Sequence, residues 1–192
     1  MDFILTFLNK FLTNVSVETL NKFKSLVVEK KHKKNEIIVS KGEIPYKFYI
    51  LRDGVIGSIV IEDKGKEFIK TLYTPITTTG DLPSLIQQTP SNTIYQCLTD
   101  CTLIEGDFND FIKITEQDHT FALLYCRILE MIFIRTEKKM NTLAVLNASE
   151  RYIKLKKEIP NIENLIPQYH IASYLNITPV QLSRIRKEIN SK

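Results

Sequence analysis

The chain has 192 residues, 43% of them hydrophobic and 25% charged, with a formal net charge of +4. These values exclude a disordered chain and predict one medium-sized and one small folded domain. No apolar run approaches the ~20 residues that span a bilayer, no secretory signal is recognisable, and three cysteines are too few for a disulfide framework, so we expect a cytoplasmic protein without a membrane partner.

Helical spacing of apolar residues marks the first 29 positions of the chain. Apolar side chains at positions 7, 8, 11 and 12 share one face, and a second such segment runs from Val17 to Val28, so two short helices are predicted. Four lysines and a histidine follow at positions 30–34. We expect this basic run to be a solvated entrance to the first strand, with contact to DNA flanks as the alternative.

From about Asn35 the apolar spacing changes from helical to alternating, which is the pattern of β-strands. Short segments of this kind lie within residues 37–39, 48–51, 55–61, 68–72, 93–98 and 102–106. Turn residues separate them, as in Lys41-Gly42 and Asp53-Gly54. Many short strands with such corners predict an antiparallel roll or barrel rather than a parallel sheet.

A long helix without Pro or Gly is predicted over residues 118–146. At about 1.5 Å per residue it measures ~40 Å, which is more than one small roll would cover. We therefore expect the helix to pair with a second copy in a homodimer, and packing on its own roll is the alternative. The predicted dimer interface consists of residues spaced three and four apart, namely Phe121, Leu124, Ile128, Met131 and Arg135.

Two capping boxes mark the starts of helices near the carboxyl end. Asn147 and Glu150 have the spacing of the first box, so a new helix is expected to begin at Asn147. Thr178 and Gln181 form the second box, and Pro179 suits the first position of the helix that follows.

Residues 165–189 are therefore predicted to form two short amphipathic helices joined by a tight turn. Ile171, Tyr174 and Leu175 give the first helix an apolar face, and Asn176 tolerates the left-handed conformation that such a turn needs. The second helix buries a stripe at positions 182, 185 and 189 and turns its polar side chains outward.

An outward polar face of this kind suits the major groove of double-stranded DNA, which is the predicted partner. Residues 150–192 hold eight Lys and Arg against four acids, so the whole surplus of positive charge lies in this segment. The alternative is an ordinary structural hairpin. Bases are expected to be read by Val180, Gln181 and Arg184, and phosphates to be held by Ser173, Thr178, Ser183 and Lys187.

No constellation with catalytic spacing surrounds the three histidines, so an enzyme is not expected. Cys97 and Cys101 could pair or hold a metal with His119, but both fall on predicted strands, where cysteine is usually a small apolar residue. We therefore expect no metal and no cofactor.

Four segments in this order resemble the Crp/Fnr superfamily of bacterial transcription regulators: NEIIVSKGEIPYKFYILRDGVIGSIV, TTGDLPSLIQQTPSNT, TLAVLNASERYIKL and IPQYHIASYLNITPVQLSRIRKEI. The resemblance implies an α+β protein with N-terminal helices and an antiparallel β-roll of cyclic-nucleotide-binding type over residues 1–117. A long dimerisation helix over residues 118–146 and a winged helix-turn-helix DNA-binding domain over residues 147–192 would follow. Wing strands would have to lie within residues 161–167, and RNA polymerase would be a further partner at an unassigned surface.

The resemblance also implies an effector pocket in the roll. Gly80, Asp81 and Leu82 match the Gly-Glu-Leu turn that meets the ribose in nucleotide-binding members. Ser91 and Asn92 match the phosphate-binding segment, but Ser91 stands where the family has Arg, so binding of cyclic AMP is not expected. On the long helix Thr136 falls where some members place a hydroxyl against the purine. An iron–sulfur cluster is excluded for this chain alone, because four thiolates are needed.

Two functions follow as hypotheses. The first is a homodimeric, sequence-specific transcription regulator whose roll senses an unknown small molecule. The second is a ligand-binding or partner-binding module whose carboxyl-terminal hairpin is only structural.

Overall fold

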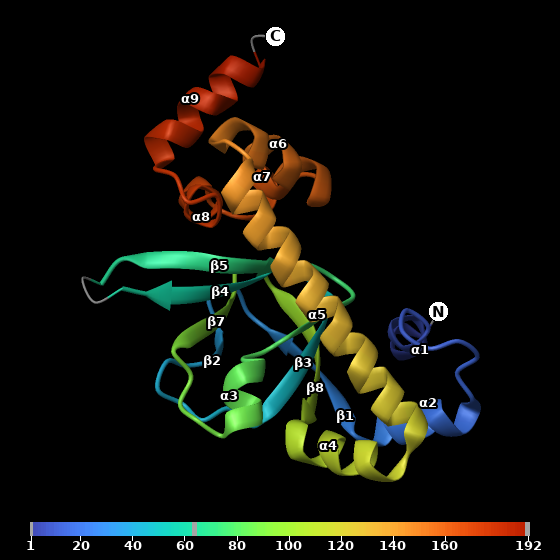
Figure 1. Ribbon diagram of the computed structural model, residues 1–192. Coiled ribbons are helices and arrows are strands. Elements are labelled where there is room, and N and C mark those ends of the chain that lie inside the picture. Colours follow the sequence, from blue (N-terminus) through green and yellow to red (C-terminus); the bar gives the residue numbers. More distant parts are fainter. Residues whose placement is uncertain (1, 63–64, 191–192) are drawn as a thin grey trace.

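The computed structural model describes residues 2–62 and 65–190. Figure 1 shows a β-roll with two small helices at one side, a long helix, α5, that runs along the roll, and a group of short helices at its far end. The arrangement confirms the predicted α+β architecture with an antiparallel roll.

The two predicted N-terminal helices are present as α1 (Phe3–Leu8) and α2 (Val17–Ser25). Each begins at a side-chain cap, since the Asp2 carboxylate accepts a hydrogen bond from the Ile4 N–H and the Ser16 hydroxyl accepts one from the Thr19 N–H. Helix α2 ends before the predicted Val28, because Val27 already belongs to the first strand.

Two four-stranded antiparallel sheets form the roll. One has the order β1-β8-β3-β6 and the other the order β2-β7-β4-β5. The short helix α3 (Leu82–Gln87) precedes β7, and α4 (Phe108–Gln117) follows β8. The strands are β1 (Val27–His32), β2 (Ile37–Val39), β3 (Lys47–Asp53), β4 (Ile56–Ile61), β5 (Glu67–Tyr73), β6 (Thr77–Thr79), β7 (Thr93–Cys97) and β8 (Cys101–Asp107).

Lys30, Lys31 and His32 of the basic run lie within strand β1, and Lys33 and Lys34 follow its end, so the run does not precede the first strand as predicted. Lys30 and His32 contact Glu105, a carboxylate of β8 that is only 3% exposed. Glu105 accepts a hydrogen bond from Lys47 Nζ at 3.0 Å and contacts His32 Nε2 at 2.7 Å. Burial opposes ionisation of Glu105, but these hydrogen bonds hold its pKa below the usual value. Lys30, His32 and Lys47 therefore form a polar network around Glu105.

Helix α5 (His119–Val145) is a single helix, as predicted, and Asp118 caps its start. Its first turns lie in the core, since Phe121 and Leu124 have no exposed surface. The Phe121 ring stacks on Phe23 of α2 and meets Phe111 of α4 edge-on. The prediction that Phe121 and Leu124 form a dimer interface is therefore wrong, because this face of the helix packs on the chain's own roll.

The group of short helices consists of α6 (Ala148–Glu158), α7 (Ile162–Leu165), α8 (Gln168–Tyr174) and α9 (Pro179–Asn190). Helix α6 begins with the predicted capping box, in which Asn147 and Glu150 exchange hydrogen bonds. Helix α7 stands where wing strands were expected, and the described residues after α5 contain no strand, so the winged form is not observed. None of the helices described is both long and apolar enough to cross a membrane.

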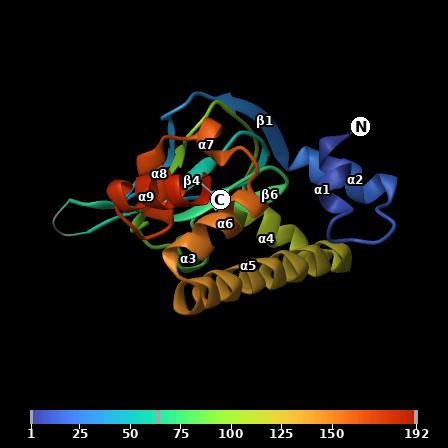
Figure 2. The same cartoon turned by 90° about the horizontal axis from the view of Figure 1, so that it is seen from above.

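The short helices share a hydrophobic cluster with the roll. Ile69 and Leu72 of β5 belong to the same cluster as Ile171 of α8 and Leu182 of α9. In Figure 2, α5 passes along one side of the roll while the short helices lie over it. This packing fixes where α9 presents its outer face.

Candidate DNA-binding helix and effector cavity

The turn between α8 and α9 has the predicted geometry. Asn176 is left-handed, with φ of 55°. The Thr178 hydroxyl accepts a hydrogen bond from the Gln181 N–H at 3.2 Å, and the Gln181 side-chain oxygen accepts one from the Thr178 N–H at 2.9 Å. This reciprocal capping box sets the start of α9.

The two faces of α9 divide as its sequence predicts. Leu182 has no exposed surface and Ile185 only 8%, while Val180 on the other face is 61% exposed. Helix α9 lies on the outside of the molecule, away from the roll (Figure 1). The face that points outward carries Thr178, Val180, Gln181, Ser183, Arg184 and Lys187, all of them exposed.

Ser173 lies apart from this outward face. Its hydroxyl accepts a hydrogen bond from the Ile69 N–H of β5 at 2.8 Å. It therefore joins α8 to the roll, and in this arrangement it does not hold a phosphate. The prediction for Ser173 is corrected accordingly.

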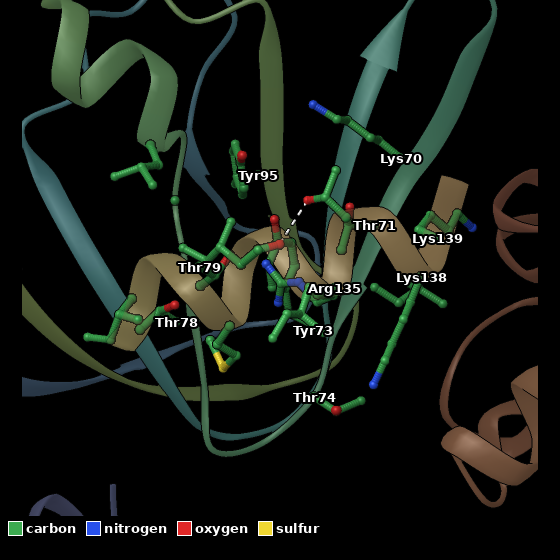
Figure 3. A pocket seen from close by; sticks show the side chains of 18 of the residues that line it. Lys70, Thr71, Tyr73, Thr74, Thr78, Thr79, Tyr95, Arg135, Lys138 and Lys139 are labelled. Atoms are coloured by element: carbon green, nitrogen blue, oxygen red, sulfur yellow. Dashed lines mark hydrogen bonds between the residues drawn. The ribbon is translucent and has the colours of Figure 1, made fainter. Parts of the chain in front are cut away.

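A cavity of about 1390 Å³ extends between β5, β6, the inner side of α5 and the short helices. Of the predicted pocket residues, Gly80, Leu82 and Thr136 line it. The Thr136 hydroxyl donates to the Ile132 carbonyl one turn back in α5, at 2.9 Å. Figure 3 shows polar side chains of the roll and α5 around the cavity.

The other predicted pocket residues do not line the cavity. Asp81 is buried, and its carboxylate accepts hydrogen bonds from the Ser91 hydroxyl at 2.5 Å and the Ser84 hydroxyl at 2.9 Å. Asn92 is exposed to solvent. The Ser91 hydroxyl and the Asp81 carboxylate are therefore hydrogen-bonded to each other. Neither side chain lines the cavity, so the prediction that they contact a ligand there is corrected.

Several cavity residues were not recognised from the sequence as pocket residues. The Arg135 guanidinium lies 4.8 Å from the centre of the Tyr73 ring, and the Tyr95 ring lies 6.1 Å beyond Tyr73. Arg135, with Ile128 and Met131, was predicted to form a dimer interface, but all three line the cavity. The missed signal was that a cation stands inside an otherwise apolar stripe of α5.

Lys139 also lines the cavity, where it joins α5 to α8. Its ammonium donates to the Tyr174 carbonyl at 3.1 Å and lies 3.3 Å from the centre of the Tyr174 ring. Burial, together with the nearby charge of Arg151, lowers the pKa of Lys139 to about 8.

Comparison with known proteins agrees with this geometry. Residues 29–118 match the family model of the cyclic nucleotide-binding domain. FixK2 of Bradyrhizobium japonicum superposes with a TM-score of 0.72 at 17% identity, over 86% of this chain and 85% of that one. The c-di-GMP-responsive global regulator CLP of Xanthomonas campestris gives 0.71 at 15% identity, over 92% of each chain. The chain has the Crp/Fnr fold.

A further solved structure with this fold matches at a lower TM-score. The catabolite activator protein of Thermus thermophilus superposes with a TM-score of 0.56 at 15% identity, over 93% of this chain and 85% of that one. No curated protein sequence matches the chain. The structural matches therefore cover nearly the whole length of the chain, whereas the family model covers the roll.

The three cysteines are free thiols. Cys97 and Cys101 are buried at the turn between β7 and β8, and Cys126 is exposed on α5. Over residues 2–62 and 65–190, no group of His, Cys, Asp and Glu side chains is placed to hold a metal ion.

Proposed function

We propose that this protein is a sequence-specific DNA-binding transcription regulator of the Crp/Fnr type. The observation that carries the proposal is the outward face of α9, which is polar and basic, begins at a formed capping box and lies on the outside of the molecule. A helix presented in this way fits the major groove.

The residues of α9 divide by the chemistry of their side chains. Arg184 can form two hydrogen bonds with guanine and Gln181 two with adenine, while Val180 can contact a thymine methyl group. Thr178, Ser183 and Lys187 hold phosphates and set the orientation of the helix. Domain boundaries near residues 117 and 146 remain predictions, with the junction of α5 and α6 at Leu146 and Asn147.

We propose a homodimer that forms through the outer side of α5. Two apolar side chains of α5 that do not line the cavity are exposed there, Leu123 by 39% and Phe133 by 65%. Pairing two copies along this face would remove them from water and would present two α9 helices to major grooves about 34 Å apart. Phe121 and Leu124, which were predicted to form the interface, are buried against the chain's own roll.

The roll with its cavity is the proposed sensor of a small-molecule effector. Cyclic AMP is not favoured, because Ser91 occupies the position of the phosphate-binding Arg and is engaged by Asp81. RNA polymerase is a further proposed partner of the bound dimer.

The test is a selection of genomic fragments with the purified protein. An enriched inverted repeat supports the proposal, and random fragments contradict it. Arg184→Ala should relax discrimination at one base by roughly 1 to 3 kcal/mol, whereas Lys187→Ala should weaken all sites about equally. Lys41→Ala, which removes an exposed charge from the roll, is the control and should leave the selected sequence and the affinity unchanged.

One observation favours the second hypothesis, a ligand-binding module with a structural hairpin. Helix α8 is fixed to β5 by the Ser173 hydrogen bond and by a shared apolar cluster. In that case the same selection would return random fragments, and the protein would still bind a small molecule.

A further inference from the structure

The cavity beneath α5 carries an excess of positive charge. Eight lysine and arginine side chains line it against two glutamates, Glu130 and Glu158. Some of these cations have partners: Lys10 donates to the Ile76 carbonyl at 2.8 Å, and Arg127 pairs with Glu130 at 2.8 Å. The cavity therefore has more cationic than anionic side chains, and some of the cations have no carboxylate partner within it.

Arg135 is the most informative of these cations. It is half-buried, and no carboxylate of the described residues lies within ion-pair distance of its guanidinium. Its contact is the Tyr73 ring, at 4.8 Å. Lys10 is close enough that burial and the positive charge of Arg135 together lower the pKa of its ammonium. Two cations thus face the same space, which is unfavourable unless an anion lies between them.

The roll offers hydrogen-bond donors beside this cation. The hydroxyls of Thr78 and Thr79 are buried and have no hydrogen-bond partner among the described residues, and both side chains line the cavity. Thr79 is only 6% exposed. Figure 3 shows Thr79, Tyr73 and Arg135 gathered at the inner side of α5. A buried hydroxyl without a partner is unfavourable, and an acceptor oxygen in the cavity would supply one.

We propose that this cavity binds a small anion through Arg135, which pairs with a carboxylate or phosphate group of the ligand, while Thr79, on the same face of the roll as Tyr73 and Tyr95, donates to one of its oxygens. The acid group thus lies on the α5 side of the cavity and not at the Ser91 segment. The inference deepens the proposed function, since it names the chemical class of the effector. A guanidinium suits this role because its planar array of N–H groups matches both kinds of oxyanion.

The test is thermal unfolding of the full chain in inorganic phosphate and in chloride, at one pH and equal ionic strength. A ligand that binds the folded state raises Tm in proportion to its occupancy. Phosphate also stabilises folded proteins in general, so the readout is the difference between variants. Arg135→Gln should raise the phosphate concentration for half of the stabilisation by about tenfold or more. Arg135→Lys should retain part of the effect, because it keeps the charge.

Lys113→Gln is the matched control, since Lys113 is an exposed cation of α4 that does not line the cavity. It should respond to phosphate as the unmodified chain does. If Arg135→Gln gains as much stability from phosphate as the unmodified chain, the proposal is overturned.

A second arm separates the two sources of the acid group. Adenosine monophosphate and citrate are compared with the uncharged adenosine. Stabilisation by either anion at lower concentration than inorganic phosphate, with dependence on Arg135, supports the proposal and shows whether the ligand is a phosphate ester or a carboxylic acid. Equal stabilisation by adenosine would overturn it. These measurements do not involve DNA. The anion site can therefore be confirmed when fragment selection gives no enriched sequence, and DNA binding can be confirmed when no anion site is found.

Discussion

The two halves of α5 belong to one uninterrupted helix, yet their surroundings differ. In the first half Phe121 and Leu124 have no exposed surface, because α2 and α4 pack against them. In the second half Phe133 is 65% exposed, and the inner side borders the cavity. An apolar stripe therefore shows that a face avoids water, but it does not show whether the roll or another molecule covers it.

The largest expected effect concerns packing in the first half of α5. Phe121→Ala removes a fully buried ring and should lower the free energy of unfolding by about 3 to 5 kcal/mol. Urea denaturation measures the change. Phe133→Ala is the matched control and should change stability by only about 0.5 kcal/mol when the protein is dilute and monomeric. Equal losses for the two variants would show that the halves do not differ in packing.

The second prediction tests whether the outer side of α5 forms the dimer interface. Phe133→Glu places a charge at the centre of the proposed dimer interface and should weaken dimerisation by about 2 kcal/mol, roughly 30-fold in Kd. Sedimentation equilibrium measures the dissociation constant. Val17→Glu, at a position that is 75% exposed on α2, should leave it unchanged. An unaltered Kd for Phe133→Glu would place the interface elsewhere.

A smaller effect concerns how the short helices dock beyond the second half of α5. Ser173→Ala removes the bond to the Ile69 N–H and should cost about 1 kcal/mol of stability. Ser183→Ala, on the exposed face of α9, should not change stability but should weaken DNA binding. Denaturation and fluorescence anisotropy with the selected fragment separate the two roles. If Ser173→Ala weakened DNA binding at full stability, the hydroxyl would be a phosphate contact after all.

The smallest effect is a pH dependence at the end of α5. The folded pKa of Lys139, about 8, is below that of an unfolded lysine, so the unfolded chain holds more protons between about pH 8 and pH 10. Lys139 therefore makes stability rise with pH across this window, and the burial penalty applies in full below it. Lys139→Met should flatten the rise in Tm, and Lys138→Met should not. An identical slope in both variants would contradict the burial of this charge.

Local patterns predicted the elements that depend on neighbours in the sequence. The capping boxes at Asn147 and Thr178 formed as expected, because their partners lie three residues away. The alternating strands were recognised, but β1 was not, since Lys30, Lys31 and His32 do not alternate with apolar residues. Those side chains are exposed or half-buried on an edge strand, and Lys30 and His32 contact Glu105, which is far along the chain.

The site divides in the same way. The outward face of α9 could be predicted, because a short amphipathic helix has one buried stripe and the remaining side chains must face away from it. The cavity could not be predicted, because Arg135 meets Tyr73 and Thr79 only when α5 lies along the roll. The pocket segments were found, but the Asp81–Ser91 hydrogen bond closes them to a ligand.

The sequence by itself determined the periodicity of the strands and helices, the caps that begin the helices and the polar face of α9, since each depends on residues within a few turns of one another. Only the tertiary structure decided which side of α5 is buried, which cations border the cavity and where Ser173 binds. These features depend on contacts between segments that are distant in the chain, and local spacing carries no information about which segments will meet.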